Sequence, residues 1–414
     1  MQRVTTVIIG AGQAGLAMSR ILGDQGVDHV VLERGDVANS WRKERWDSLR
    51  LLTPNWQSRL PGNAYQGQDP DGFMTMPQVV RRLSDYATES AAPVMTGTRV
   101  IAVRASGGHY LVETTRGKFA CATLVIASGT CNLASVPAFA TSVPARIRQV
   151  SPLDYKRPED LPEGGVMVVG GSATGAQLAR EIRASGRQVI LSVGEHVRAP
   201  RRYRGRDIMW WMDRTGVMDQ GFRDADDLSR VRRLPSLQLV GSRDGMIDLN
   251  TLQAEGVEVV GRLSTIRDGR ALFSGGLANN CALADLKLGR LLATIDEWAD
   301  GIGAGTAIGP RERFAPTAVS SAPRLDLDLS GGEIGSVVWA TGYRPDHSWL
   351  DLPVFDRKGR LKHDGGVVTG APGVYALGLP FLRRRKSTFI DGVGADAADL
   401  AGHLAHHLGM RHAA

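Results

Sequence analysis

Cysteine is scarce in this chain of 414 residues. The three cysteines, Cys121, Cys131 and Cys281, are far apart in the sequence and form no C-x-x-C pair. This spacing argues against a metal cage and against a dithiol redox centre. Unpaired cysteines are typical of a reducing compartment, so we expect a cytoplasmic protein without a metal site.

Long apolar runs are also missing. No stretch approaches the roughly 18 apolar residues that a membrane span needs, and Met1 leads directly into an apolar strand pattern rather than into a signal peptide. We therefore expect no contact with a membrane. The nine histidines are scattered and lie mostly near the C-terminal tail, and we assign none of them a catalytic role.

The charge is basic but unevenly distributed. The formal net charge is +7, and the excess is concentrated in RAPRRYRGR at 198–206 and RRRK at 383–386. A nucleic-acid surface would combine basic and aromatic residues repeatedly, and no such repeat is present. Local sites for anions such as cofactor phosphates are the better interpretation.

The first glycine-rich turn lies at residues 5–15, which read TTVIIGAGQAG. The β-branched run predicts a buried parallel strand, and a helical pattern follows the glycines. In the spacing G-x-G-x-x-G, Gly10 allows a tight turn, Gly12 leaves room for a pyrophosphate, and Gly15 lets helix and strand approach. The helix N-terminus would direct its amides and its dipole at the phosphates. A second strand pattern, HVVLE, ends at Glu33, where a carboxylate can accept hydrogen bonds from an adenosine ribose.

A second turn of the same kind occurs in VMVVGGSATG at 166–175. Gly170 and Gly175 hold the outer positions and Ser172 holds the middle one. A serine hinders the approach of a phosphate without forbidding it, and its hydroxyl can donate to phosphate. A turn that has lost its ligand and is kept for packing is the alternative.

The strand after the second turn favours NADPH over NADH. It carries Ser192 where an acid would repel a 2′-phosphate. Arg198, Arg201 and Arg202 follow and would attract that phosphate, although Glu195 adds a negative charge nearby.

Two dinucleotide sites in one chain imply electron transfer between them. The pattern resembles the two-dinucleotide-binding-domain flavoproteins, in particular the class B flavin-containing monooxygenases, over nearly the whole chain. The segments WDSLRLLTPNWQSRLPGNAYQGQDPDGFMTM, RAPRRYRGRDIMWWMD and LRRRKSTFIDGVGADA resemble a bacterial CzcO-like subgroup. The resemblance implies an α/β fold of two Rossmann-like, three-layer domains, with FAD on the first turn and NADPH (NADP+) on the second.

In this family the NADPH domain is inserted into the FAD domain. We therefore expect an FAD domain at 1–155 and 326–414 and an NADPH domain at 156–325, with a helical insertion at about 203–300. Two segments resemble the family's linker strands, TLVIASGT and SVVWATGYRPD, and the last strand and helix would direct the helix N-terminus near Gly392 at the flavin. The predicted cofactor-binding residues are Gly10, Gly12, Gln13, Ala14, Gly15, Glu33, Arg34, Ser40, Trp41, Val100, Ser128, Gly129, Gly170, Gly171, Ser172, Ala173, Thr174, Gly175, Ser192, Arg198, Arg201, Arg202, Thr341, Gly342, Gly378 and Gly392.

The resemblance also implies a catalytic asparagine. Family members use one to position a C4a-(hydro)peroxide of the flavin, and Asn55 matches it, while a turn-forming asparagine after Pro54 is the alternative. The family fingerprint of Phe, Gly, His and Trp/Tyr before the second turn is reduced here to Tyr155, because other residues occupy its first three places: Ala145, Ile147 and Ser151.

We therefore expect an NADPH-dependent FAD monooxygenase that uses molecular oxygen on a small organic substrate. Because the family histidine is missing, an NADPH oxidase or flavin reductase is an alternative function. A non-catalytic redox-sensing protein is an alternative from another functional class. A homodimer is left open, and neither nucleic acid nor membrane is an expected partner. The RRRK run either attracts an anionic substrate or anionic flavin, or pairs with acids of the neighbouring domain. Trp210 and Trp211 either line a substrate channel or belong to the core or to an interface.

Overall fold

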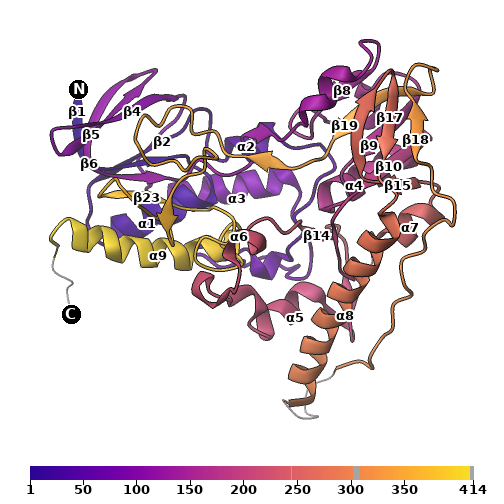
Figure 1. Cartoon of the computed structure of the whole chain (residues 1–414). Coiled ribbons are helices and arrows are strands. Elements are labelled where there is room, and N and C mark those ends of the chain that lie inside the picture. Colours follow the sequence, from indigo (N-terminus) through magenta and orange to yellow (C-terminus); the bar gives the residue numbers. More distant parts are fainter. Residues whose placement is uncertain (244, 302–307, 411–414) are drawn as a thin grey trace.

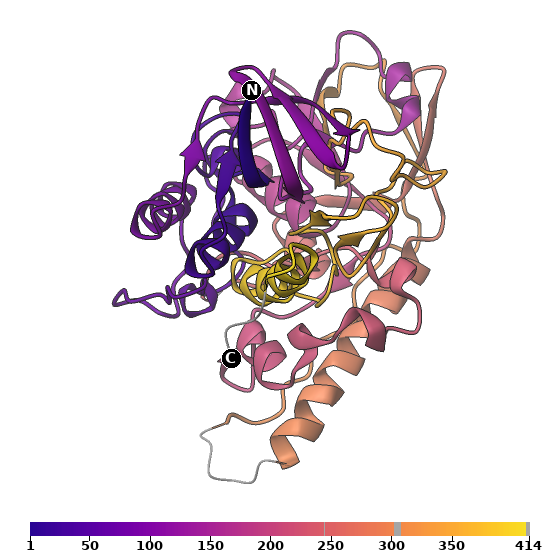
Figure 2. The same ribbon diagram turned by 90° about the vertical axis from the view of Figure 1, so that its left-hand side faces the viewer.

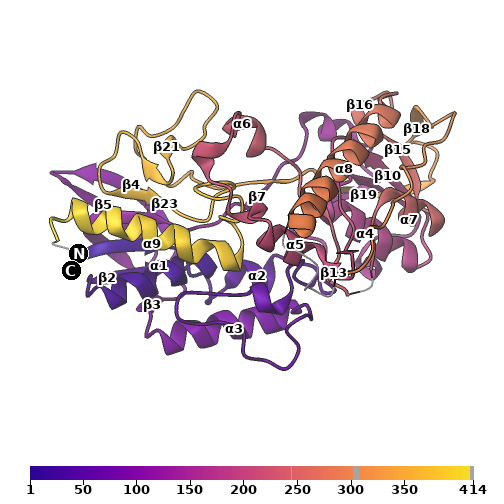
Figure 3. The same ribbon diagram turned by 90° about the horizontal axis from the view of Figure 1, so that it is seen from below.

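The computed structural model describes residues 1–243, 245–301 and 308–410. Two α/β units lie side by side, and the chain passes from the first to the second and back again (Figure 1, Figure 3). Each unit is built on its own parallel sheet, so the predicted fold of two Rossmann-like domains is confirmed.

The first unit contains a parallel core in the strand order β3-β2-β1-β6-β23. Alternate side chains of β1 enter opposite hydrophobic clusters, Ile8 on one face and Val7 and Ile9 on the other, because successive residues of a strand point to opposite faces. The five strands are β1 (Gln2–Ile9), β2 (His29–Leu32), β3 (Val94–Met95), β6 (Gly117–Ile126) and β23 (Val374–Ala376).

Helices cover one face of this sheet, where α1 lies between α3 and α9 (Figure 2). The helices are α1 (Gln13–Asp24), α3 (Met76–Glu89) and α9 (Ile390–His407), and the short α2 covers Asn39–Lys43. An antiparallel pair that joins β6 packs on the opposite side, and a second pair extends the edge at β23. These strands are β4 (Val100–Ser106), β5 (His109–Thr114), β21 (His363–Asp364) and β22 (Val367–Val368).

The second unit has five parallel strands in the order β15-β10-β9-β19-β8. They are β8 (Arg148–Val150), β9 (Gly165–Val169), β10 (Val189–Val193), β15 (Glu258–Gly261) and β19 (Ile334–Trp339). One face carries α4 (Ala173–Ala184) and α7 (Leu249–Ala254). The other carries an antiparallel meander of β16 (Leu263–Arg267), β17 (Arg270–Phe273) and β18 (Asp326–Asp328).

The boundaries between the units differ from the expected ones. Both β8 and β19 belong to the second sheet, although they lie outside the expected range 156–325. We therefore propose that the second unit covers about 148–339. Where the chain passes between the units, β7 (Leu133–Ala134) pairs with β20 (Tyr343–Arg344).

The segment predicted as a helical insertion at 203–300 is of mixed structure. It contains α5 (Ile208–Arg214), α6 (Leu228–Val231) and α8 (Leu277–Gly301), but also β15 of the second sheet and the hairpin of β16 and β17. Two short strand pairs also involve this segment. The strand β11 (Val197–Arg198) pairs with β14 (Leu237–Gln238), and β12 (Arg202–Tyr203) pairs with β13 (Arg206–Asp207). Helix α8 extends along the outside of the second unit (Figure 3).

Across residues 1–243, 245–301 and 308–410, no helix combines the length and the apolar character that crossing a bilayer requires. The same residues contain no group of three or more His, Cys, Asp or Glu side chains placed to hold a metal ion.

Gly402 in the interior of α9 offers a direct test of this helix. A Cβ built at Gly402 would meet nothing within 4 Å, and glycine inside a helix costs roughly 0.5–1 kcal/mol relative to alanine. We expect Gly402→Ala to raise the free energy of unfolding by about that amount, measured by urea denaturation. A loss of stability would contradict the open space that the structure shows beside this residue.

Candidate functional site

The first glycine-rich turn joins β1 to α1, and two of its glycines are fixed by the chain itself. Gly10 has φ +108°, and a Cβ there would lie 2.5 Å from the carbonyl oxygen of Ala127. A Cβ on Gly15 would lie 1.8 Å from the carbonyl oxygen of Gly10. Both glycines are therefore needed for the close approach of β1, α1 and the end of β6.

Gly12 has a different role. It precedes the first residue of α1 with extended backbone angles, φ −86° and ψ −172°, which any residue can adopt. A Cβ at Gly12 would meet no protein atom within 4 Å, and the residue lines a cavity that reaches from this turn to the second unit, called the main cavity below. The space beside Gly12 therefore belongs to the cavity, next to the N-terminus of a helix, where anions are favoured.

Glu33 closes the turn from the side of β2. Its side chain is buried, and its two carboxylate oxygens accept hydrogen bonds from the backbone amides of Ala11 and Gly35, each at 2.9 Å. The carboxylate is thus held at the cavity wall and keeps lone pairs for further donors, because each carboxylate oxygen can accept more than one hydrogen bond.

One cavity of about 930 Å³ begins at this turn and extends between the two units. Twelve of the predicted cofactor-binding residues line it: Gly10, Gly12, Gln13, Ala14, Glu33, Arg34, Ser40, Trp41, Val100, Ser128, Gly129 and Gly378. The structure therefore brings together most of the residues assigned to the first turn.

Polar contacts link several residues of the cavity wall. The indole Nε1 of Trp41 donates to the side-chain oxygen of Gln13 at 3.1 Å, and the Gln13 amide donates to the carbonyl of Thr388 at 3.2 Å. The buried Ser128 hydroxyl at the wall has no hydrogen-bond partner among the described residues. A dinucleotide carries phosphates and hydroxyl groups, and the cavity offers partners for both. These are the free space at Gly12, the hydrogen-bonded carboxylate of Glu33 and the unpaired hydroxyl of Ser128.

The second turn repeats the backbone of the first. A Cβ on Gly170 would lie 2.3 Å from the carbonyl oxygen of Ala340, and one on Gly175 would lie 1.7 Å from the carbonyl oxygen of Gly170. Ser172 precedes α4 with φ −79° and ψ −174°, close to the angles of Gly12. Its side chain makes no capping hydrogen bond, so the hydroxyl is left for other partners.

The other residues predicted around the second turn have local roles. A Cβ on Gly171 would lie 2.9 Å from the side chain of Val193, so this glycine packs against β10. Ala173 and Thr174 are the first two residues of α4. In the returning linker, the Thr341 hydroxyl donates to the carbonyl of Ser135 at 2.6 Å, and Gly342 has φ +96°.

Three residues predicted to hold an NADPH phosphate have side chains that are already bonded to other groups of the protein. The buried Ser192 hydroxyl donates to the carbonyl of Gly261 and accepts from the amide of Leu263, which ties β10 to β15. Arg198 is 3% exposed and pairs with two carboxylates, those of Asp248 and Asp285.

Arg201 is also buried, where it bonds to Asp207 and to the carbonyl of Leu52. These positions are inconsistent with the prediction for Ser192, Arg198 and Arg201. Arg202 is exposed and donates to the carbonyl of Gly205 within its own hairpin.

The end of β10 has other cations that sequence reasoning missed. The side chain of Arg262 lies 3.5 Å from a Cβ built on Gly194, and the Lys287 ammonium donates to Glu195 at 2.7 Å. The hydrogen bond from Lys287 lowers the pKa of Glu195, and the positive charges of Arg230 and Arg233 act in the same direction. Arg262 follows β15 and Lys287 comes from α8, so no local motif links them to the turn.

Asn55 does not line the cavity, whose wall in this segment is formed by Leu51, Leu52 and Thr53. Its amide nitrogen donates to the carbonyl of Asp69, and its backbone amide donates to Gly72. Asn55 begins the 3₁₀ turn Asn55–Gln57, so the structure favours the turn-forming alternative over the catalytic one.

Gly392 lies in the first turn of α9 but serves packing. A Cβ there would lie 1.7 Å from the carbonyl oxygen of Lys386, so the residue lets the loop at 383–386 approach the helix. Trp211 is fully buried and contacts the rings of Trp210 and Trp298, and neither Trp210 nor Trp211 lines the cavity. Trp211 therefore belongs to the core, and Trp210 is partly buried against it.

A family model described as pyridine nucleotide-disulphide oxidoreductase matches residues 7–207. An uncharacterized CzcO-like oxidoreductase of Geobacillus kaustophilus is 31% identical over 412 residues, which cover 98% of this chain and all of that protein. A probable indole-3-pyruvate monooxygenase of Arabidopsis thaliana is 30% identical over 186 residues, 42% of this chain and 44% of that protein. Among solved structures, a flavin-containing monooxygenase of Stenotrophomonas maltophilia matches with a TM-score of 0.69 at 20% identity, over 99% of this chain and all of the other.

Proposed function

Because the chain belongs to the CzcO-like oxidoreductases, we propose that it is an NADPH-dependent FAD monooxygenase that oxygenates a small organic substrate. The observation that carries this proposal is the continuous cavity that begins at the glycines of the first turn and extends between the two units. The similarity to a plant monooxygenase over 42% of the chain supports the same reaction class.

The residues of the first turn fit FAD. Gly12 would admit the pyrophosphate at the N-terminus of α1, and Glu33 would accept hydrogen bonds from the adenosine ribose. When bound, the flavin supplies the acceptor for a hydride from NADPH and, in its reduced form, the reaction with molecular oxygen. Trp41, Gln13 and Thr388 form a hydrogen-bonded chain along the cavity that would keep the walls fixed around the reacting atoms.

The second turn fits a nucleotide held less tightly. Its outer glycines keep the required backbone, while Ser172 narrows the approach at the middle position. A bound phosphate would accept hydrogen bonds from the first amides of α4 and from the Ser172 hydroxyl. This difference supports FAD as the resident cofactor of the first turn and NADPH as the exchanging cofactor of the second.

Purification and oxygen consumption test the proposal. We expect a yellow protein with about one FAD per chain that oxidises NADPH and, with a suitable substrate, transfers oxygen to it. A colourless protein that takes up no FAD would contradict any function as a flavoenzyme. Stoichiometric hydrogen peroxide from NADPH, unaffected by any substrate, would identify an NADPH oxidase instead. The absence of the family histidine at Ser151, whose hydroxyl donates to Asp154 at 2.7 Å, favours that second candidate.

The preference for NADPH is predicted to depend on Arg262 and Lys287. We expect Arg262→Ala to raise the Michaelis constant for NADPH about tenfold and to leave that for NADH unchanged, because tenfold corresponds to one charge-assisted hydrogen bond to the 2′-phosphate. Lys287→Ala should act in the same direction, since it leaves Glu195 uncompensated. Steady-state kinetics with both nucleotides measure the effect, and Arg202→Ala is the control. Equal changes for NADPH and NADH would contradict a role in phosphate recognition.

A further inference from the structure

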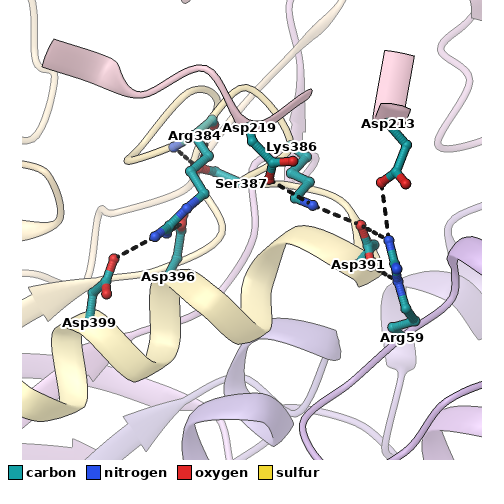
Figure 4. A network of polar contacts seen from close by, with 9 residues as sticks. All are labelled: Arg59, Asp213, Asp219, Arg384, Lys386, Ser387, Asp391, Asp396 and Asp399. Carbon is teal, nitrogen blue, oxygen red and sulfur yellow. Dashed lines mark hydrogen bonds and ion pairs between the residues drawn. The ribbon is translucent and has the colours of Figure 1, made fainter. Parts of the chain in front are cut away.

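Three of the four cations in the run at 383–386 are paired with carboxylates. Figure 4 shows the pairs of Arg384 and Lys386. Arg383 contacts Asp399, and Arg384 contacts both Asp396 and Asp399 on α9. Lys386 contacts Asp219 of the second unit and Asp391 at the start of α9. For these three residues the structure favours ion pairing over attraction of a substrate.

Arg385 differs from its neighbours. Within residues 1–243, 245–301 and 308–410, no carboxylate lies within 4 Å of its guanidinium, and its buried Nε has no partner. The side chain is half-buried, donates to the side-chain oxygen of Gln220, and lies 5.5 Å from the ring centroid of Phe381. Burial lowers the pKa of Arg385, but a guanidinium remains protonated in proteins. A positive charge is therefore held without a counter-charge.

The backbone fixes Arg385 between the two units. Its amide donates to the carbonyl of Gln220 at 3.1 Å, and the amide of Phe222 donates to the carbonyl of Arg383 at 2.8 Å. The loop at 383–386 thus pairs with the segment 217–222 of the second unit. Arg385 lines the main cavity at this junction.

The wall around this junction is apolar. It is contributed by the side chains of Met209, Met212, Met218, Leu234, Leu237, Leu239 and Phe381. Methionines are adaptable and accept apolar groups of various shapes. The segment 209–239 contributes no acidic residue to the wall. Among the described residues, the acidic side chains that line the cavity are those of Glu33 and Asp346, which lie on other segments.

A second arginine lies on the same wall. Arg232 donates through Nε to the carbonyl of Phe381 at 3.3 Å and lines the cavity. It has no carboxylate within 4 Å in the part of the chain that the structure describes. Both guanidinium groups therefore contact Phe381, Arg385 at the ring and Arg232 at the backbone.

We propose that Arg385, assisted by Arg232, binds the carboxylate of a substrate whose apolar body contacts the methionine-rich wall. An arginine presents its donors in a plane that matches two carboxylate oxygens, and the uncompensated charge here would be satisfied by that anion. The inference rests on the proposed function, because it takes this cavity to be the place where the substrate is oxidised. It names the class of substrate, an apolar organic acid.

Isothermal titration of the FAD-loaded chain with matched acids and amides tests the proposal. The probes are 4-phenylbutanoate, hexanoate and benzoate, each compared with its neutral primary amide. For at least one pair we expect the acid to bind the wild-type protein 10- to 100-fold more tightly than the amide, as charge-assisted hydrogen bonds predict. Arg385→Met should abolish this preference, and Arg385→Lys should restore part of it. The exposed Arg233→Met is the matched control and should keep the preference.

Two results would overturn the proposal. One is equal affinity for acid and amide in all three pairs. The other is an unchanged preference in Arg385→Met. A lower FAD content or a shifted flavin reduction potential in that variant would then show that the guanidinium serves the cofactor. Calorimetry needs no turnover, so an acid preference that depends on Arg385 in a chain that does not oxidise NADPH would contradict the proposed function and still support the acid-binding site at Arg385.

Discussion

Gly12→Val is expected to give a folded protein that contains no flavin. A Cβ at this position meets no protein atom within 4 Å, and the backbone angles at Gly12 are accessible to any residue. The added side chain would therefore enter the cavity rather than the protein, at the place where we propose the pyrophosphate binds. We expect FAD content to fall from about one per chain to below a tenth, since a side chain there excludes the close backbone approach that the turn provides.

The flavin-to-protein absorbance ratio measures the loss, and circular dichroism shows that the variant is folded. Ser172→Val is the matched control, because Ser172 has nearly the same backbone angles in the second turn. It should keep its FAD and weaken NADPH binding. Normal FAD content in Gly12→Val, or loss of FAD in Ser172→Val, would contradict the assignment of the two turns.

Arg198→Met is expected to destabilise the second unit rather than to change the choice of nucleotide. The guanidinium contacts Asp248 at 2.6 Å and Asp285 at 2.8 Å, and it donates to the carbonyl of Ala315. Asp248 itself is 1% exposed and caps α7 by accepting from the amide of Thr251. Removing the arginine leaves the buried carboxylate of Asp248 and the partly buried one of Asp285 uncompensated, and the loss of a partner from a buried ion pair typically costs about 3–5 kcal/mol.

Urea denaturation measures this loss in the free energy of unfolding. Arg202→Met provides the comparison, because Arg202 is exposed, and substitutions at such positions usually change stability by less than about 0.5 kcal/mol. The two variants separate a structural role from a role in phosphate recognition. A stable Arg198→Met that prefers NADH would restore the original interpretation of this residue.

The parts of the site that depend on local backbone could be predicted from the sequence. Gly10, Gly12 and Gly15 lie within one turn of a few residues, and Glu33 directly follows the next strand, so spacing alone indicates their arrangement. The same holds for Gly170 and Gly175. In each turn the last glycine avoids a clash with the carbonyl oxygen of the first glycine, five residues earlier, and a fixed spacing in the sequence is the sign of such a local requirement.

The parts that depend on distant partners could not be predicted. Arg198 is adjacent to a turn, but its partners Asp248 and Asp285 lie 50 and 87 residues further along the chain. Nothing local distinguishes its charge from that of Arg202. The same limit applies to Arg385, which has the same neighbours in sequence as three paired cations and lacks their carboxylates.

The boundaries of the two units could not be predicted accurately either, because they depend on pairing between strands that are distant in the sequence. The short strand β8 is recognisable only through its parallel pairing with β19, a strand that follows it by nearly two hundred residues. The cavity wall at 209–239 has no periodic pattern, because its methionines and leucines come from a short helix, turns and a two-residue strand. The sequence shows their apolar character but not which face of the molecule they enclose.

The middle position of each turn has a consequence for how such a protein can evolve. Gly12 and Ser172 both have extended backbone angles, so the fold itself demands no particular residue at either place. Single substitutions there can change how long a nucleotide stays without a penalty in folding. One turn can be selected for permanent retention and the other for rapid exchange, each independently of the other and of the surrounding core.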